Sequence, residues 1–281
     1  MSNTFTGKSN EDIKILISRL EADLNPINTR RLLGLLDFTS LNVTDSIASI
    51  EGICDKLNNY QYAFPDLPVF AAVCVYPRFV PVLKKNLELP LLKIASVAGG
   101  FPSSQTSTRI KTEEAKEAIA EGADEIDMVM PVGEFISGNR EFIRDEIAAV
   151  KEITGKRHLK VIIESGLLEG PDMIYDASLL AMEAGADFIK TSTGKEKVSA
   201  SLEAVYIMCH AIRDFHHAGG KMKGIKPAGG IAGPEEAVSY YSLVEMVLGK
   251  QWLLPDYFRI GASRLANRLI SKVEGRNVEY F

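Results

Sequence analysis

Residues 122–127 read Gly-Ala-Asp-Glu-Ile-Asp, and residues 185–190 repeat the pattern as Gly-Ala-Asp-Phe-Ile-Lys. In each segment the glycine is suited to end a helix in a left-handed cap, and an apolar strand follows at once. Because side chains alternate between the two faces of a strand, Asp127 and Lys190 are predicted to point the same way. The repeat therefore predicts two helix-to-strand units, each with a polar side chain at the same offset.

The same unit recurs along the chain. Short apolar, β-branched runs alternate with segments of helical period, as at Ala115, Ala118 and Ile119. Strands are predicted to begin near Leu32, Val69, Leu92, Asp124, His158, Asp187, Met222 and Phe258. Eight units, each long enough for a strand, a loop and a returning helix, fit an α/β fold of the (β/α)8 TIM-barrel type better than a doubly wound sheet.

No linker or shift in composition divides the chain, so we expect residues 1–281 to form a single domain. Residues 9–24 are predicted to form an extra helix, which makes 1–25 an N-terminal helical extension. Residues 274–281 are predicted to be a polar C-terminal tail. The tail is either frayed or a flap over the barrel mouth, and we expect it to be frayed.

Composition excludes several classes of protein. Hydrophobic residues make up 46% and charged residues 25%, and the net charge of −5 gives no general support for a nucleic-acid surface. The longest apolar run, 67–77, is too short for a membrane span, and the first 25 residues lack the apolar stretch of a signal peptide. Three widely spaced cysteines favour free thiols in a reducing cytoplasm. We therefore expect a cytoplasmic protein with no nucleic-acid or membrane partner.

Lys190 is the first candidate for chemistry, because it ends an apolar strand and precedes a polar glycine loop. A buried ammonium group is costly to desolvate, so a lysine inside a barrel suggests an amine nucleophile that forms a Schiff base. The alternative is a lysine that reaches solvent at a strand end. Lys226 ends another short strand, and repulsion between two ammonium groups would lower the pKa of one by roughly 1–3 units. Alternatively, Lys226 pairs with an acidic neighbour such as Glu164.

Two carboxylates are predicted to lie near these lysines. Asp127 could relay the protons that imine formation and carbon–carbon cleavage move, or it could form only a structural ion pair. Asp37 is predicted to end the first strand, where it would bind substrate hydroxyls or cap the helix that follows. Cys74, at the end of the second strand, is more commonly an inert buried thiol.

Three glycine-bearing loops follow late strands, at 193–195, 229–230 and 261–263. The last of these opens a helix, whose free N–H groups suit an anion, and phosphate sites on this fold commonly use such loops. The chain has no G-x-G-x-x-G or Walker A string, which argues against dinucleotide and P-loop chemistry. The four histidines show no metal-site spacing, so we expect no metal and no cofactor.

Six segments together closely resemble the deoxyribose-phosphate aldolase family, in order and with similar spacing. They are VCVYPRF (73–79), DEIDMVMP (124–131), LKVIIESGLL (159–168), FIKTSTGK (188–195), GIKPAGGI (224–231) and FRIGASRL (258–265). The likeness runs from about Leu32 to Leu265. It implies a class I aldolase on a (β/α)8 barrel that cleaves 2-deoxy-D-ribose 5-phosphate reversibly to D-glyceraldehyde 3-phosphate and acetaldehyde without a metal. It also implies a possible homodimer.

The resemblance assigns roles to matching positions. It implies that Lys190 forms the Schiff base, that Lys226 lowers the pKa of Lys190 and joins the proton relay, and that Asp127 is the acid/base carboxylate working through water. It also implies substrate contacts at Asp37, Thr39 and Thr193, and phosphate contacts at Gly194, Lys195, Gly229, Gly230, Gly261 and Ser263.

The chain departs from the family pattern at two positions near the phosphate loops. Some members have a basic residue where this chain has Ala232, and some have a second serine where Arg264 stands. Arg264 either replaces the lost positive charge or points to solvent. Two other functions are considered: a lysine-imine aldolase for a ketose or keto-acid phosphate, and a non-enzymatic protein that binds sugar phosphates.

Overall fold

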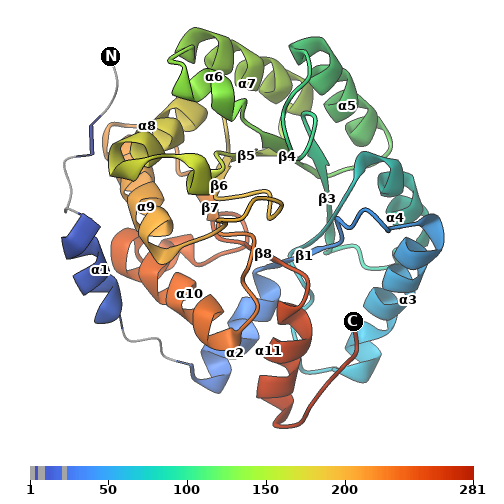
Figure 1. The fold of residues 1–281 in the computed structure, drawn as a ribbon. Helices are drawn as coiled ribbons and strands as arrows, with labels where there is room; N and C mark the ends of the chain where they lie inside the picture. Colours follow the sequence, from blue (N-terminus) through green and yellow to red (C-terminus); the bar gives the residue numbers. More distant parts are fainter. Residues whose placement is uncertain (1–3, 6–9, 21–23) are drawn as a thin grey trace.

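The structure is a computed structural model that describes residues 4–5, 10–20 and 24–281. In this part of the chain, eight parallel strands form one ring (Figure 1). They are β1 (Leu36–Thr39), β2 (Ala72–Val75), β3 (Lys93–Ala98), β4 (Glu125–Val129), β5 (His158–Ile162), β6 (Phe188–Lys190), β7 (Gly224–Lys226) and β8 (Ile260–Ala262). The ladders run in the order β7-β6-β5-β4-β3-β2-β1-β8, and two isolated bridges, Ile225–Phe258 and Ala228–Gly261, close the ring between β7 and β8. The predicted (β/α)8 barrel is confirmed.

Helices surround the ring of strands (Figure 1). They are α3 (Ile47–Ala63), α4 (Val80–Asn86), α5 (Thr108–Ala120), α6 (Val132–Ile136), α7 (Arg140–Thr154), α8 (Gly170–Glu183), α9 (Leu202–His217), α10 (Pro234–Leu248) and α11 (Leu265–Glu274), with short 3-10 turns η1 (Pro77–Phe79), η2 (Ser165–Leu167) and η3 (Lys250–Trp252). Each long helix buries one face; α7, for example, buries Ile143, Ile147 and Val150 at helical spacing. The core lies between these faces and the outer side of the strands.

The first strand begins later than expected. Leu32 and Leu33 are fully buried but belong to the helix α2 (Pro26–Gly34), and β1 starts only at Leu36. The side chain of the N-cap residue Asn25 accepts a hydrogen bond from the backbone N–H of Asn28, and Pro26 stands in the first turn. Both features favour the start of a helix here. A short apolar run buried in a helix has the same appearance as a buried strand, so the sequence pattern did not separate the two. The other seven strands begin within three residues of their predicted starts.

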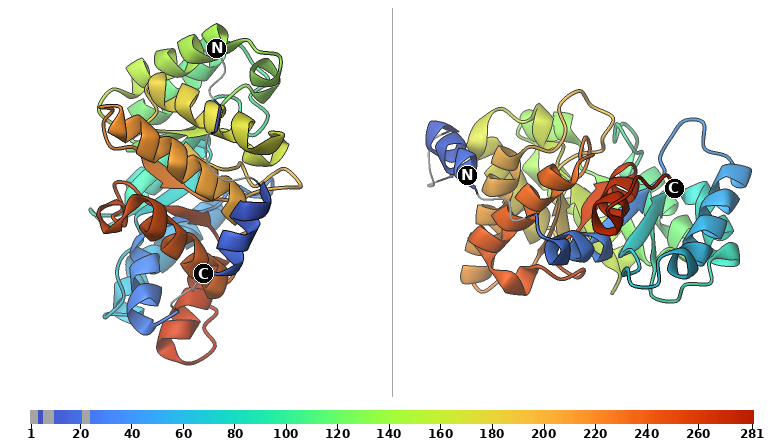
Figure 2. Two further views of the ribbon diagram at one scale, coloured as in Figure 1. Left: turned by 90° about the vertical axis from the view of Figure 1, so that its left-hand side faces the viewer. Right: turned by 90° about the horizontal axis from the view of Figure 1, so that it is seen from below.

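The N-terminal helix is shorter than predicted. The structure describes α1 (Asn10–Ser18), which packs against α9 on the outside of the ring (Figure 2). Residues 9 and 21–23 of the predicted helix lie outside the described residues, and the chain at 24–25 is not helical.

The C-terminal tail is neither frayed nor a flap over the barrel. The Phe281 ring lies 4.9 Å from the Phe38 ring and 5.3 Å from the Phe70 ring, and the Tyr280 ring lies 5.3 Å from that of Phe64. Asn267 of α11 donates to the Phe281 carbonyl at 3.0 Å and accepts from its backbone N–H at 2.9 Å. The expectation of a frayed tail was wrong because the two terminal aromatic rings bury apolar area beside β1.

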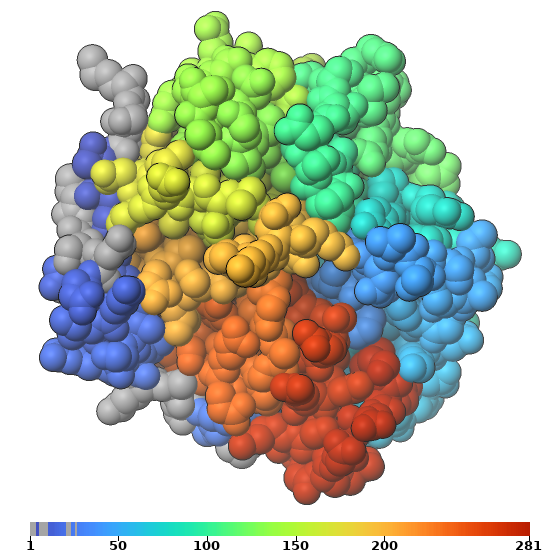
Figure 3. Space-filling view, in the orientation of Figure 1, coloured from blue at the N-terminus to red at the C-terminus, as the bar shows by residue number. Residues whose placement is uncertain are grey.

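The loops at the carboxyl ends of the strands form the face seen in Figures 1 and 3. The segment between β6 and α9, residues 191–201, lies across the middle of this face (Figure 3). Active sites of this fold occur at the carboxyl ends of the strands. None of the helices in the described residues is long and apolar enough to cross a membrane.

Candidate active site

A cavity of about 220 Å³ opens at the carboxyl ends of β1, β6, β7 and β8. It is lined by Thr39, Leu41, Asn42, Lys190, Thr193, Gly194, Lys195, Ala228, Gly229, Gly230, Ile231, Gly261, Ala262, Ser263 and Arg264. All six residues predicted to hold phosphate line it, together with Lys190 and with the predicted substrate contacts Thr39 and Thr193. The structure therefore brings the candidate nucleophile and the three glycine loops into one cavity.

Lys190 lines this cavity, and beneath the lining it meets Lys226 and Asp127. The amine nitrogens of both lysines lie 2.8 Å from the same oxygen, Oδ2 of Asp127. Lys190 and Lys226 are register partners in the β6–β7 ladder, which places both amines at one level of the barrel. The prediction that Asp127 and Lys190 point into the same interior is confirmed. All three side chains are almost completely buried.

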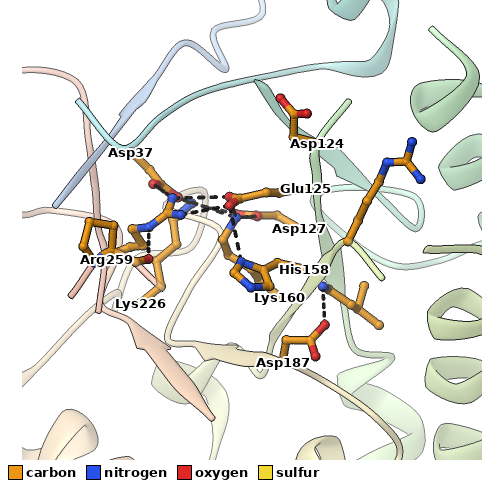
Figure 4. Close-up of polar contacts among 12 residues, drawn as sticks. Asp37, Asp124, Glu125, Asp127, His158, Lys160, Asp187, Lys226 and Arg259 are labelled. Carbon is orange, nitrogen blue, oxygen red and sulfur yellow. Dashed lines mark hydrogen bonds and ion pairs between the residues drawn. The ribbon is translucent and has the colours of Figure 1, made fainter. Parts of the chain in front are cut away.

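Three further charged residues extend this cluster deeper into the barrel, and none was singled out from the sequence (Figure 4). The Nζ atom of Lys160 lies 2.5 Å from Glu125 Oε2 and 3.0 Å from Asp127 Oδ1. Arg259 bridges Asp37 Oδ1 at 2.6 Å and Glu125 Oε1 at 2.8 Å. A charged residue within an apolar strand was the available signal: Glu125 stands two positions before Asp127, so the two share a face.

We call Asp37, Glu125, Asp127, Lys160, Lys190, Lys226 and Arg259 the ionic layer. Among the described residues, this layer contains three carboxylates and four basic groups. Burial alone would raise the pKa of Asp127, but Lys160, Lys190 and Lys226 outweigh burial and hold it well below its usual range. Burial likewise opposes the charge on Lys226, but Asp127 and Asp37 raise its pKa above the ordinary value. Basic neighbours likewise outweigh burial and lower the pKa values of Asp37 and Glu125, so the three carboxylates and Lys226 are charged at neutral pH.

The ionic layer contains one more basic group than it has carboxylates. Arginine is always protonated, so three carboxylates are balanced by Arg259 and two lysine ammonium groups. A fourth buried cation would lack a counter-charge and would be costly. Lys160 lies within 4 Å of three carboxylates and Lys226 of two, whereas Lys190 contacts only Asp127. Lys190 therefore has fewer carboxylate partners than Lys160 or Lys226.

Asp37 lies in a different place from the one predicted. It is the second residue of β1 rather than its last, is fully buried, and is absent from the cavity lining. Its carboxylate pairs with Lys226 at 2.5 Å and with Arg259, so it neither caps a helix nor faces the cavity. The predicted strand end was wrong because the helix α2 takes up the first half of the apolar run.

Glu164 does not pair with Lys226. Its carboxylate instead accepts hydrogen bonds from Thr193, at 2.7 Å from the hydroxyl and 3.2 Å from the backbone N–H. Lys226 is held by the two aspartates, which excludes the alternative ion pair. Thr193 also accepts from the backbone N–H of Lys195 at 3.1 Å, and so it braces the loop that follows β6.

The phosphate-type loops approach each other closely. Gly229 has a φ of 87°, and a Cβ there would lie 2.7 Å from the Ser199 side chain and 3.0 Å from the Gly194 Cα. A Cβ at Gly261 would lie 3.0 Å from the Lys226 side chain, so this glycine leaves room for the lysine. Such contacts explain why glycine stands at these positions.

Three basic side chains line the cavity, and two of them have a polar partner within the protein. Lys190 pairs with Asp127, and Lys195 donates to the Leu41 carbonyl at 2.5 Å. Arg264, the N-cap residue of α11, has no ion pair among the described residues and lines the cavity, whereas Ala232 does not line it. Arg264 is thus available to an anion. No group of three or more His, Cys, Asp and Glu side chains that could hold a metal ion occurs in the described part of the chain.

Comparisons with known proteins give the family of this chain. The sequence model of the DeoC/LacD aldolase family matches residues 41–246. A candidate deoxyribose-phosphate aldolase of Caenorhabditis elegans is 40% identical over 262 residues, which cover 91% of this chain and 86% of the relative. The deoxyribose-phosphate aldolase of Mus musculus is 39% identical over 260 residues, or 87% of this chain and 81% of the relative.

A crystal structure supports the fold independently. A candidate deoxyribose-phosphate aldolase from Toxoplasma gondii superposes with a TM-score of 0.80 at 24% identity, covering 91% of this chain and 97% of that one. The family match extends from β2 to β7 and so includes Lys190 and Lys226. The chain therefore belongs to the DeoC/LacD family of aldolases.

Proposed function

We propose that this protein is a deoxyribose-phosphate aldolase, which cleaves 2-deoxy-D-ribose 5-phosphate reversibly to D-glyceraldehyde 3-phosphate and acetaldehyde through an imine on Lys190. One observation carries the proposal. Lys190 lines a cavity built from glycine loops and has a single carboxylate partner within a layer that has one basic group in excess. The family and the names of the relatives supply the substrate.

The reaction begins with attack by the neutral amine of Lys190 on C1 of the open-chain sugar phosphate. Loss of water gives a protonated imine, which acts as an electron sink. The new positive charge forms on the nitrogen that lies 2.8 Å from the Asp127 carboxylate. Asp127 therefore stabilises this charge as it forms.

Cleavage of the C2–C3 bond requires removal of the proton from the C3 hydroxyl. Asp127 is ionised and Lys226 is charged, so the two form a base and an acid joined at 2.8 Å. A water molecule would connect this pair to the C3 oxygen. As the bond breaks, its electron pair moves into the imine to form an enamine, and glyceraldehyde 3-phosphate leaves. Protonation of the enamine carbon and hydrolysis then release acetaldehyde and restore Lys190.

The phosphate group would lie at the end of the cavity away from Lys190. Loops after β6, β7 and β8 meet there, and α11 begins directly behind Ser263 and Arg264. Free backbone N–H groups at a helix start favour an anion. Anchoring the phosphate would fix C1 next to Lys190, which lowers the entropic part of the barrier.

The same proposal includes a cytoplasmic location and a homodimer. The three cysteine thiols are free and buried in the structure, which supports a reducing compartment. The dimer rests on the family resemblance alone.

Steady-state assays with different donors test the substrate assignment. The protein should cleave 2-deoxy-D-ribose 5-phosphate, and in the reverse direction should add acetaldehyde to glyceraldehyde 3-phosphate at least about 100-fold faster than pyruvate or dihydroxyacetone phosphate, roughly the discrimination that a pocket makes between substrates that differ by one small group. Lys190→Met should abolish all of these reactions. Efficient use of pyruvate or dihydroxyacetone phosphate would assign the barrel to another lysine-imine aldolase.

A further inference from the structure

Arg259 lies beneath the catalytic groups rather than among them. It directly precedes β8, is 2% exposed, and does not line the cavity. Its guanidinium group spans the barrel from Asp37 on β1, at 2.6 Å, to Glu125 on β4, at 2.8 Å. Its Nε atom donates to the Pro255 carbonyl, so each of the three guanidinium nitrogens makes a hydrogen bond. Arg259 is thus held as a fixed cation deep in the ionic layer (Figure 4).

We propose that Arg259 is a positioning residue whose permanent charge keeps Lys190 uncharged and nucleophilic in the free enzyme. This inference rests on the proposed role of Lys190. It assigns a function to a residue that touches neither the substrate cavity nor the reacting atoms.

The argument follows from charge balance. With Arg259 present, the carboxylates of Asp37, Glu125 and Asp127 are neutralised by Arg259 together with the ammonium groups of Lys160 and Lys226. Proton binding by Lys190 would then place an excess cation in a dry interior. If a neutral residue replaced Arg259, the layer would lack one positive charge, and an ammonium group at Lys190 would supply it.

Other titratable groups near the ionic layer do not replace Arg259. Burial, followed by the charge of Asp127, raises the pKa of Cys74 on β2 to about 11, so this thiol is neutral. Burial raises the pKa of Glu164, whose carboxylate is engaged by Thr193. His158 Nδ1 lies 3.4 Å from Glu125 Oε1 and would add a positive charge only when protonated. The effect of Arg259 should therefore persist in a His158→Gln background.

The test measures the pH dependence of imine formation at Lys190 without using the sugar phosphate. The protein is incubated with propanal and cyanoborohydride at a series of pH values, and labelling of the peptide that contains Lys190 is quantified by mass spectrometry. Arg259→Met should move the midpoint of labelling upward by about one pH unit, the lower end of shifts caused by a nearby charge. Arg259→Lys keeps the charge and should restore the wild-type midpoint.

Glu125 provides the opposite perturbation. Glu125→Gln removes a negative charge from the same layer, so the midpoint should move downward, and the double variant Arg259→Met/Glu125→Gln should return close to wild type. Loss of packing alone cannot give shifts of opposite sign that cancel. If Arg259→Met does not fold, the upward shift of the midpoint from Glu125→Gln to the double variant still measures the effect of Arg259.

Lys111→Met is the matched control. Lys111 is also a buried lysine in a 2.5 Å ion pair, with Glu146, but it lies outside the ionic layer. Its replacement should reduce stability and leave the midpoint unchanged. Unmoved or same-direction midpoints in the Arg259→Met and Glu125→Gln proteins would overturn the inference while sugar-phosphate cleavage still supports the proposed function. Shifts of opposite sign without any cleavage would overturn the proposed function alone.

Discussion

Lys190 and Lys226 are cross-strand partners whose amine nitrogens both lie 2.8 Å from Oδ2 of Asp127. One carboxylate oxygen thus serves a lysine that lines the cavity and a lysine that does not. Lys226 has a second carboxylate, Asp37, at 2.5 Å, whereas Lys190 has none. This asymmetry separates the two lysines: two carboxylates hold the Lys226 ammonium group, whereas Lys190 has one carboxylate partner and lines the cavity.

Asp127→Asn should separate imine formation from bond cleavage. The amide keeps the shape of the carboxylate but cannot act as a base, so turnover should fall by about 10²–10⁴-fold. Borohydride reduction in the presence of 2-deoxy-D-ribose 5-phosphate should then trap the full-length sugar on Lys190. Asp124→Asn is the control, because Asp124 adjoins the same strand and instead accepts from the Ile94 backbone at 2.9 Å. A two-carbon adduct formed at the wild-type rate in Asp127→Asn would contradict the relay.

Arg264→Ala should weaken binding of the phosphate group. We expect KM for 2-deoxy-D-ribose 5-phosphate to rise about tenfold, because a charge-assisted hydrogen bond contributes roughly 1.5–3 kcal/mol. Activity on 2-deoxyribose should not change. Without ligand the variant should be slightly more stable, since a cation at the start of a helix is unfavourable.

Arg268→Ala is the matched control for Arg264. Arg268 and Arg264 both line a neighbouring cavity of about 360 Å³. Unlike Arg264, Arg268 does not line the catalytic cavity. Its KM for the phosphorylated sugar should equal that of wild type. Equal KM values for the Arg264→Ala and wild-type proteins would show that Arg264 points to solvent.

Phe281→Ala should destabilise the barrel. The ring packs against Phe38 and Phe70 at centroid distances of 4.9 and 5.3 Å, so its loss should lower the free energy of unfolding by about 1–3 kcal/mol. Chemical denaturation measures this change. Tyr62→Ala removes a ring that is 87% exposed and should change stability by less than about 0.5 kcal/mol. Similar stabilities for the two variants would mean that the tail is not docked in solution.

His210→Gln should make stability less dependent on pH. Burial, and then the charge of Arg213, lower the pKa of His210 to about 4. Between about pH 6.5 and pH 4 the unfolded chain binds a proton at this position that the folded protein does not, so stability falls as pH falls. The side chain is partly exposed, which limits the effect to about 1–2 kcal/mol.

The measurement for His210 is denaturant unfolding at neutral pH and near pH 4.5. The variant loses the ring contact with Tyr206, 4.4 Å between centroids, so it should start lower and then lose less stability on acidification. His217→Gln, at an exposed position of the same helix, should follow the wild-type profile. A His210→Gln profile parallel to wild type would contradict the assignment.

Much of the barrel could be predicted from local pattern. The repeated glycine before β4 and β6 marks a helix end and a strand start, and alternation along each strand places Asp127 and Lys190 on one interior face. The glycine loops were predictable because the residues before and after them are strongly patterned. The helix α2 was missed because Leu32 and Leu33 are buried in either conformation, and only Asn25 and Pro26 mark its start.

The ionic layer could be predicted only in part. Lys190 and Lys226 stand at strand ends beside glycine loops, which draws attention to them. Lys160 and Arg259 are equally buried, but their partners come from strands distant in sequence, 222 residues apart for Arg259 and Asp37. The charge balance of the ionic layer depends on these cross-barrel contacts, so no single segment contains it. The docking of the tail on Phe38 depends on a similar long-range contact.

Borohydride trapping with 2-deoxy-D-ribose 5-phosphate, followed by peptide mass mapping, tests the central claim most directly. The account predicts a reduced two-carbon adduct on the peptide that contains Lys190, and no adduct in Lys190→Met. This result would establish the nucleophile, the imine and the cleavage in one measurement. An adduct on Lys195 or Lys226, or an unmodified but folded wild-type protein that still turns over the sugar phosphate, would contradict the account.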